Sequence, residues 1–371
     1  MARADDATAV GINPAGLAEI QSTIIQISNQ LSYNAYSYTR APTAIYRENQ
    51  DPMQVTFPRV SNQTPWQAAD PFFGVASNLG LNDWGFALAV SAPPGIAKMQ
   101  FPLAAQDESE NSGQRYMMVS RESLILNYSA SVAWKYADRF GVGATLQWIH
   151  VPSLEYSLVI DGSTFPAAAN PVSSNMDILS TVKGSSLFTF NAILGMWFRP
   201  VPHFQLGLAG QVVPADITVK SHLSVVPLGD LVGSVKLTRD GSLANDVTLT
   251  LPLPMVFRGG VRYRHMDGLR EVFDIELDVD YTTWSRVKRL GIDANNMQAT
   301  AQSSVLTLNS ISIEKHWRDS IGIRLGGDYA VIPDRLTLRA GGYYETAVSP
   351  AAYFNVDNGT GAIRGVYLQG N

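Results

Sequence analysis

The sequence predicts an all-β fold, a transmembrane antiparallel β-barrel, and three observations support this prediction. Apolar and polar residues alternate with a period of two, the alternating segments run for about ten residues or more, and tight turns alternate with long polar stretches. Strands of soluble sheets usually have about five or six residues, whereas a tilted strand that crosses a bilayer has about ten. The strand lengths therefore favour a membrane barrel.

The composition agrees with a membrane barrel and excludes other classes. Charged residues make up 16% of the 371 residues, below the roughly 25% of a typical soluble domain. The net charge of −5 argues against a nucleic-acid partner, because phosphate binding needs clustered Lys and Arg. The sequence has no cysteine and no apolar run near the ~18 residues of a transmembrane helix. If the chain crosses a membrane, it must therefore do so as a closed barrel.

Five segments carry the clearest alternation and are expected to be strands. They are residues 84–91, 124–136, 203–213, 256–281 as a hairpin, and 320–329. Tight connections are expected at 81–83, 137–139, 266–270 and 332–334. Long polar or irregular stretches, expected to be loops, lie at 41–70, 101–115, 160–184, 223–245 and 289–305. Short turns at one end and long loops at the other are typical of outer-membrane barrels.

Aromatic residues crowd the short turns, as expected for a ring at a membrane interface. The alternative is that aromatics also end strands in soluble sheets. The members of this predicted ring are Trp84, Trp134, Tyr136, Phe140, Trp197, Phe198, Phe204, Tyr263, Phe273 and Trp317.

The predicted hairpin at 256–281 places opposite charges on one face. Three guanidinium groups on the first strand face four carboxylates on the second, where cross-strand neighbours interact. In a soluble sandwich this would be a solvated face; in a barrel it is a lumen wall held by ion pairs, with a structural rather than a catalytic role. We call this set the lumen ladder: Arg258, Arg262, Arg264, Asp274, Glu276, Asp278 and Asp280.

Motifs for catalysis or cofactor binding are missing from the sequence. The five His residues are scattered without metal-ligand spacing, and there is no GxSxG elbow, Walker loop or GxGxxG after a strand. We therefore expect no catalytic residue, no metal site, no cofactor and no enzyme activity.

Ala92-Pro93-Pro94-Gly95 directly follows the expected strand at 84–91. Two adjacent prolines remove two ladder N–H donors, and proline is confined to strand edges or bulges. The stretch is a candidate gap in the barrel wall. The alternative, that the prolines end the strand and begin a loop, is equally consistent with the sequence.

The opening stretch ADDATAVGINPAGLAEI, residues 4–20, holds Asn13-Pro14-Ala15 before any strand pattern begins. On its residues alone, Asn13-Pro14 is a turn. Together with DVDYTTWSRVKRL at 278–290 and WRDSIGIRLGGDYAVIPDRLTLRAGGYYETAVSP at 317–350, however, the stretch resembles the FadL/TodX family of outer-membrane channels for hydrophobic compounds. The resemblance extends over nearly the whole sequence.

This resemblance implies a 14-strand barrel plugged by an N-terminal hatch, with release of substrate through a kink in the third strand. Carried over, Asn13, Pro14 and Ala15 are the hatch motif and line the ligand path, Asp5 and Asp6 anchor the hatch, and Ala92, Pro93, Pro94 and Gly95 form the lateral gate. About 11 strands are expected, with the start of another. Residues 1–22 would be a partial hatch and residues 23–371 an incomplete barrel, in a sequence that lacks its signal peptide and its last strands.

The expected function is passive uptake of hydrophobic small molecules, such as long-chain fatty acids or aromatic hydrocarbons, across the bacterial outer membrane. The alternative is a structural or adhesin-like barrel whose loops bind a partner. Expected partners are a hydrophobic ligand and outer-membrane lipids or other amphiphiles, with no nucleic acid, and the protein is expected to be a monomer.

Overall fold

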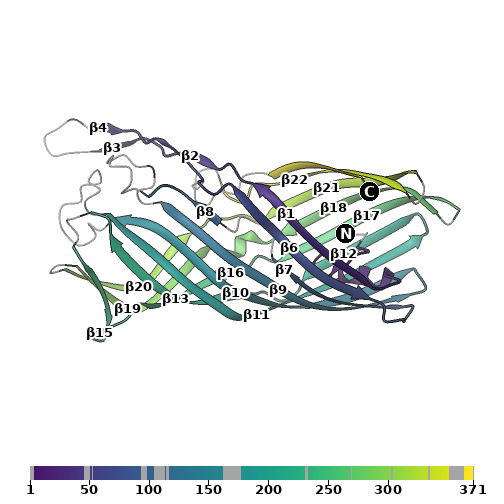
Figure 1. Cartoon of the computed structure of the whole chain (residues 1–371), viewed down its shortest axis with the longest axis horizontal. Coiled ribbons are helices and arrows are strands. Elements are labelled where there is room, and N and C mark those ends of the chain that lie inside the picture. Colours follow the sequence, from purple (N-terminus) through teal and green to yellow (C-terminus); the bar gives the residue numbers. More distant parts are fainter. Residues whose placement is uncertain are drawn as a thin grey trace.

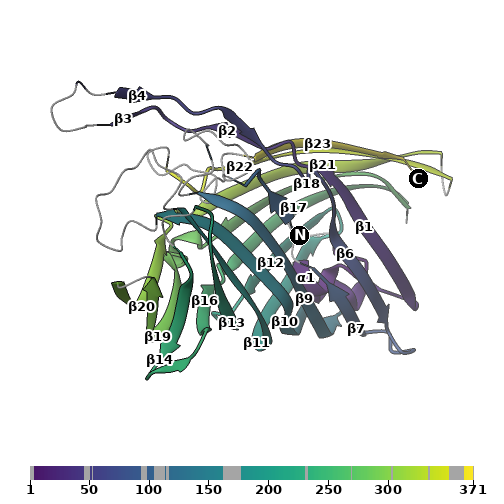
Figure 2. The same ribbon diagram turned by 60° about the vertical axis from the view of Figure 1, so that its left-hand side comes forward.

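In a computed structural model, the chain forms a large antiparallel β-sheet that curves into a barrel wall around the N-terminal segment (Figures 1 and 2). The structure describes residues 4–45, 51, 53–92, 98–103, 113, 117–161, 177–229, 233–268, 270–301, 304–332, 335–350 and 363–370. The predicted all-β fold is confirmed.

The wall is a meander in which successive strands pair antiparallel. Five of its spans are each built from two strands that follow one another along the chain. The wall strands are β1 (Ile24–Tyr33), β6 (Trp66–Ser77), β7 (Trp84–Ser91) with β8 (Lys98–Gln100), β9 (Met118–Tyr136), β10 (Phe140–Asp161), β11 (Asp177–Val201), β12 (Phe204–Gln211) with β13 (Asp216–Pro227), β16 (Asp246–Pro252) with β17 (Val256–Asp267), β18 (Arg270–Thr282) with β19 (Arg289–Ala301), β20 (Ser304–Glu314) with β21 (Ser320–Ile332), β22 (Leu336–Glu345) and β23 (Ile363–Gly370).

Smaller elements complete the described part of the chain. The N-terminal segment contains α1 (Ala9–Ile12) and η1 (Pro14–Glu19), and η5 (Trp284–Arg286) interrupts the wall. The pairs β2 (Ser37–Thr39) with β5 (Arg59–Ser61) and β3 (Thr43–Ile45) with β4 (Met53–Val55) form two small sheets beyond the wall (Figure 1). β14 (Val235–Arg239) pairs with β19, and β15 (Ser242–Leu243) pairs with β14.

The predicted strands and tight turns agree with the structure where it describes them. β9 and β10 meet at a turn in which Ala137 and Asp138 both have positive φ, 48° and 51°. Two such residues in a row match the right-handed twist of the flanking strands. The expected five-residue turn at 266–270 is tighter: β17 ends at Asp267 and β18 begins at Arg270.

Four of the predicted loops contain strands. Residues 41–70 include β3, β4, β5 and the start of β6, and 160–184 include the start of β11. Residues 289–305 are mostly β19, and 223–245 contain the end of β13 with β14 and β15. These strands show the opposite face to water from the other strands, as described below, so their exposed residues are polar and resemble a loop in the sequence.

A line of interruptions, which we call the seam, crosses four neighbouring wall spans. It consists of residues 212–215, 253–255, 283–288 and 315–319. Backbone hydrogen bonds join the interruptions side by side: Leu253 N to Ala215 O and Thr283 N to Met255 O, both 2.9 Å. The seam divides the wall into a turn-side part (β12, β17, β18, β21) and a loop-side part (β13, β16, β19, β20), which lie apart in Figure 2.

In the turn-side part the exposed face is apolar and the buried face is polar. On β12, Leu206 and Leu208 are exposed while Gln205 is buried, and on β18, Leu277 is exposed while Asp274 is buried. Apolar side chains outside and polar side chains inside are the arrangement of a strand that faces lipid.

The loop-side part has the reverse arrangement. On β13, Thr218, Lys220 and His222 are exposed whereas the residues between them are buried. These inward residues pack into one apolar core with contributions from β10 and β11. The core contains Ile149, Val151, Leu154, Val182, Ala215, Ile217, Val219, Leu223, Val247, Leu249, Ile292, Ala294 and Met297. A polar exterior over an apolar core is typical of a sheet in water, so the seam lies where the barrel leaves the membrane.

Arg286 of η5 ties the seam together. Its guanidinium donates to the carbonyl oxygens of Ala215 (3.0 Å) and Leu253 (2.8 Å) and to the Asp216 carboxylate (2.8 Å). Leu253 O, at the edge of an interruption, thereby gains a donor, and Ala215 O gains a second donor besides Leu253 N. Among the described residues, no helix has the length and apolar character needed to cross a membrane.

The position of the seam predicts a difference between two arginine substitutions on the exposed face. Leu277→Arg on β18 should lower the free energy of unfolding by about 2–4 kcal/mol, because it places a charge in the apolar band. Thr218→Arg on β13 should change it by less than about 1 kcal/mol, because that residue faces water. Urea unfolding of both variants in lipid vesicles measures the difference, and equal losses would contradict the assigned boundary.

Candidate functional site

The N-terminal segment lies inside the wall, where Figure 2 shows α1 among β7, β9 and β12. Pro14 occupies the first position of η1, where its missing N–H leaves no donor unsatisfied. Asn13 precedes it, is 1% exposed, and accepts a hydrogen bond from Ala15 N at 3.3 Å. The residues of the expected hatch motif thus form a buried helix start. Of the expected anchoring residues, Asp6 bonds locally, accepting from Thr8 N at 2.8 Å.

A row of small residues on the inner wall lies under this segment. Its members are directly opposite one another on five neighbouring strands: Gly85, Ala133, Gly143, Gly195 and Ala209. A Cβ on each of the three glycines would lie 2.1 Å from Leu17 O, 2.5 Å from Ala15 N and 2.2 Å from Asn13 Oδ1, respectively. The glycines therefore allow the wall to approach the backbone of the segment. We call this row the seat.

Polar contacts fix the segment on the seat. Asn13 Nδ2 donates to Met196 O (3.2 Å), and the buried Trp197 donates from Nε1 to Ala15 O (3.1 Å). In line with the seat on the next strand, Arg258 donates to Gly11 O at 2.8 Å. On the other side, Gln26 of β1 accepts from Ala7 N at 3.1 Å.

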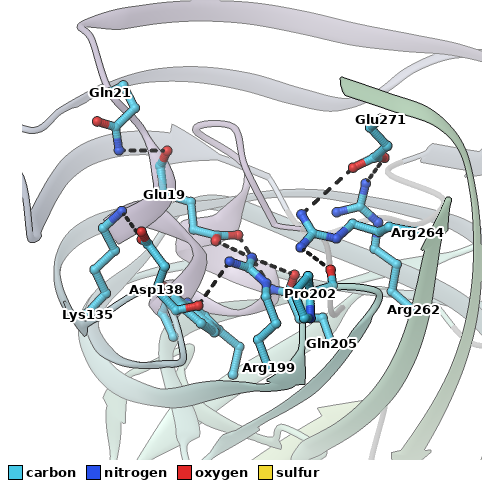
Figure 3. Close-up of polar contacts among 12 residues, drawn as sticks. Glu19, Gln21, Lys135, Asp138, Arg199, Pro202, Gln205, Arg262, Arg264 and Glu271 are labelled. Atoms are coloured by element: carbon cyan, nitrogen blue, oxygen red, sulfur yellow. Dashed lines mark hydrogen bonds and ion pairs between the residues drawn. The ribbon is translucent and has the colours of Figure 1, made fainter. Parts of the chain in front are cut away.

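The end of the segment is held by a charged cluster at the short turns (Figure 3). Arg199 donates to Glu19 Oε1 at 2.5 Å, to Gln205 Oε1 at 2.9 Å and to the carbonyl oxygen of Asp138 at 3.1 Å. Because the Glu19 and Arg199 side chains are 19% and 13% exposed, separating the pair would leave a poorly solvated charge.

In the lumen ladder Arg258 lies opposite Asp280, Arg262 opposite Glu276 and Arg264 opposite Asp274. The side-chain contacts run diagonally. Arg262 donates to Asp274 at 2.5 Å and to Glu271, and Arg264 lies 3.8 Å from Glu271.

Asp280, at the other end of the ladder, lies 3.7 Å from Arg258 and pairs with Arg324 of β21. The two remaining ladder residues, Glu276 and Asp278, line a cavity of about 900 Å³ between the N-terminal segment and β18, β21 and β22. Asp5, Asp6, Arg324 and Arg339 also line it, so this part of the lumen is polar.

Three carboxylates near the ladder, those of Glu271, Asp274 and Asp328, lie within 4.8 Å of one another. Arg262 donates to the first two, and Asp274 Oδ1 accepts from Asp328 N at 2.9 Å. The guanidinium supplies the positive charge that a cation would supply, so the cluster is explained as an ion-pair network.

Of the predicted gate, the structure describes only Ala92; Pro93, Pro94 and Gly95 lie outside the described residues. β7 pairs with β9 at 127–134, and β8 pairs with it at 120–122. The gate residues belong to the connection between these two pairings, and Ala92 N donates to Pro71 O at 3.1 Å. The gate stays a prediction.

The predicted aromatic ring is wrong at two positions. Trp197 is buried under the N-terminal segment, and Trp317 lies in the seam, where it contacts Trp284 edge to face with ring centroids 5.2 Å apart. The seat was missed in the sequence. Glycines inside strands, which often mark a close backbone approach, were the available signal.

Comparisons with known proteins agree with this architecture. The family described as "Outer membrane protein transport protein (OMPP1/FadL/TodX)" matches residues 1–355. A FadL homologue of Pseudomonas aeruginosa is similar in structure, with a TM-score of 0.68 at 16% identity over 95% of this chain and 78% of that one. A comparison with curated proteins finds no match.

Two toluene transporters also share the fold. TbuX of Ralstonia pickettii has a TM-score of 0.59 at 15% identity over 92% of this chain and 85% of its own. TodX of Pseudomonas putida has a TM-score of 0.59 at 16% identity over 98% of this chain and 83% of its own.

The seat predicts that one methyl group will displace the N-terminal segment. Gly195→Ala puts a Cβ 2.2 Å from Asn13 Oδ1 and 2.8 Å from Pro14 Cδ, so the segment must shift. We expect a larger single-channel conductance in planar bilayers. Gly291→Ala is the control, because a Cβ at Gly291 meets open space. Equal conductance in both variants would contradict the role of the seat.

The ion-pair network predicts strong coupling between Arg262 and Asp274. Arg262→Gln should lower the free energy of unfolding by about 3–5 kcal/mol, because two poorly solvated carboxylates lose their cation. Adding Asp274→Asn should restore part of the loss. Urea unfolding of the two single variants and the double variant measures the coupling; strictly additive losses would show that the pair does not act as a unit.

Proposed function

Because the chain belongs to the OMPP1/FadL/TodX family of outer-membrane transport proteins, we propose that it takes up long-chain fatty acids or aromatic hydrocarbons passively, through a lateral opening in the wall. In this proposal the N-terminal segment is the hatch that closes the lumen toward the short turns. The substrate class and the opening are parts of the proposal.

The observation that carries the proposal is a change in the lining of the barrel along its axis. On β10 the inward residues Ile149 and Val151 belong to the apolar core of the loop-side part. Below them, Gln147 donates to Ser129 Oγ (3.2 Å) and accepts from Asn191 Nδ2 (3.3 Å). An apolar solute is favoured in the first layer and disfavoured in the second, since it cannot replace those hydrogen bonds.

The position of the hatch also favours exit through the wall. Beneath the polar layer lie the seat and the segment fixed on it by Trp197 and Arg258. A solute that enters from the loops therefore meets a polar layer and then a plug. Exit through the wall, at the level where the apolar lining ends, avoids both obstacles.

The connection between β7 and β8 is the candidate exit. The two strands that it joins both pair with β9, whose Ser129 belongs to the polar layer. Two adjacent prolines there remove ladder donors, as the sequence shows. An outward groove of about 600 Å³ lined by apolar residues of β6, β7, β9, β10 and β11, among them Leu88, Leu146 and Phe190, offers a released apolar molecule a surface in the lipid.

Uptake by whole cells tests the proposal. Cells that lack their own transporter, and that express this protein, should accumulate radiolabelled oleate or toluene faster than cells with an empty vector. The double variant Pro93→Val/Pro94→Val should lose most of the uptake, whereas the control Pro227→Val at the end of β13 should keep it. No uptake by a correctly folded barrel would favour the adhesin-like alternative; uptake that the double variant retains would exclude this gate.

A further inference from the structure

A polar groove of about 510 Å³ opens on the water-exposed face of the loop-side part, just beyond the seam. It spans β16, β19 and β20, and it is distinct from the lumen and the hatch. Its lining consists of Thr250, Pro252, Arg289, Gly291, Ile292, Asp293, Asn295, Asn296, Asn309, Ser310 and Ser312.

The groove is concave for two reasons. Gly291 lies in its floor between Thr250 and Ser312, and a Cβ at this position would meet no atom within 4 Å. Farther from the seam, β19 has a bulge in which Asn295 and Asn296 both take positive φ, 48° and 58°. A bulge of this kind bends the strand and re-aims its side chains.

The bulge is held in place from outside the groove. Arg239 of β14 donates to the carbonyl oxygens of Asn295 and Ala294, both at 3.0 Å, and to the Asp246 carboxylate at 2.7 Å. The hydrogen bond from Arg239 holds the pKa of the Asp246 carboxyl below its usual range. Asn295 N also donates to Asp293 Oδ1 at 2.9 Å. The groove is therefore preformed.

The chemistry of the groove changes with distance from the membrane. Arg289, the first residue of β19 after the seam, is exposed, and it is the lining residue nearest the seam on that strand. The Asp293 carboxylate and the amides of Asn295, Asn296 and Asn309 lie farther along the strands. A guanidinium at the level of the lipid head groups suits a phosphate, and the carboxylate and amides above it suit sugar hydroxyls.

We propose that this groove binds the phosphorylated sugar head group of an outer-leaflet glycolipid of the lipid A class. The seam puts the groove at the height of the head groups, and the groove offers a guanidinium for a sugar phosphate beside polar groups for the hydroxyls of the same sugar. Acyl chains of the bound lipid would lie against the apolar turn-side face below the seam. The inference does not depend on transport.

Native mass spectrometry of the purified protein in detergent, titrated with lipid A, tests the proposal. Arg289→Gln should lower the affinity for lipid A about tenfold, because a hydrogen bond to a charged group is lost. Gly291→Leu should lower the affinity by a similar factor, because the leucine side chain would fill the floor of the groove. Arg318→Gln is the matched control: Arg318 is exposed in the seam and does not line the groove. Its binding should equal that of the unchanged protein.

Dephosphorylated lipid A should bind the unchanged protein about tenfold more weakly and should not distinguish Arg289→Gln from it. Equal losses in Arg289→Gln and Arg318→Gln would show a general basic belt and overturn the proposal, as would unchanged binding in both groove variants. Displacement of the lipid by inorganic phosphate at equal concentration would assign the groove to a free anion. Heat-modifiable gel migration checks folding, and Ser310→Ala replaces Gly291→Leu if the latter does not fold.

Discussion

One constraint determines the arrangement of the strands: the exposed face of each strand must match the polarity of the medium around it. In hydrocarbon the outer face is apolar and the polar groups turn inward; in water the order reverses. The chain satisfies both conditions along single spans by inverting its alternation at the seam. Arg286 supports the inversion, because it donates to carbonyl oxygens of two neighbouring spans beside the interruptions.

The lumen follows from the same constraint. Polar side chains that turn away from lipid must find partners inside, and the diagonal pairs around Arg262 are such partners. Where the N-terminal segment lies against the wall, the inner residues are reduced to glycine and alanine, and backbone contacts replace ion pairs. Charge on one side of the lumen and small residues on the other thus have complementary roles: one side leaves a polar cavity, the other holds the plug.

Much of this arrangement is predictable from the sequence. The strand pattern and the shared faces of the hairpin around Arg258 and Asp280 follow from alternation, because a period of two fixes which residues share a face. The strand within residues 289–305 was predicted to be a loop because its exposed face is polar and its apolar residues point inward. The seat was missed because five small residues on five strands, such as Gly85 and Gly195, meet only after pairing.

Contacts between distant parts of the chain set the limit of sequence reasoning at the site. The partner of Asn13, the carbonyl oxygen of Met196, depends on where along the barrel axis the N-terminal segment lies. Likewise, the burial of Trp197 follows from a neighbour more than 180 positions away. Neither position carries a local signal.

The inverted part of the wall also imposes an order on assembly. Strands such as β13, with Thr218 and Lys220 on their outer face, are not stable within hydrocarbon. They must therefore cross the hydrocarbon before they reach their final position. Their apolar inner faces can close into a core only after that passage. The part of the barrel that is farthest from the membrane at the end is therefore the part whose packing completes last.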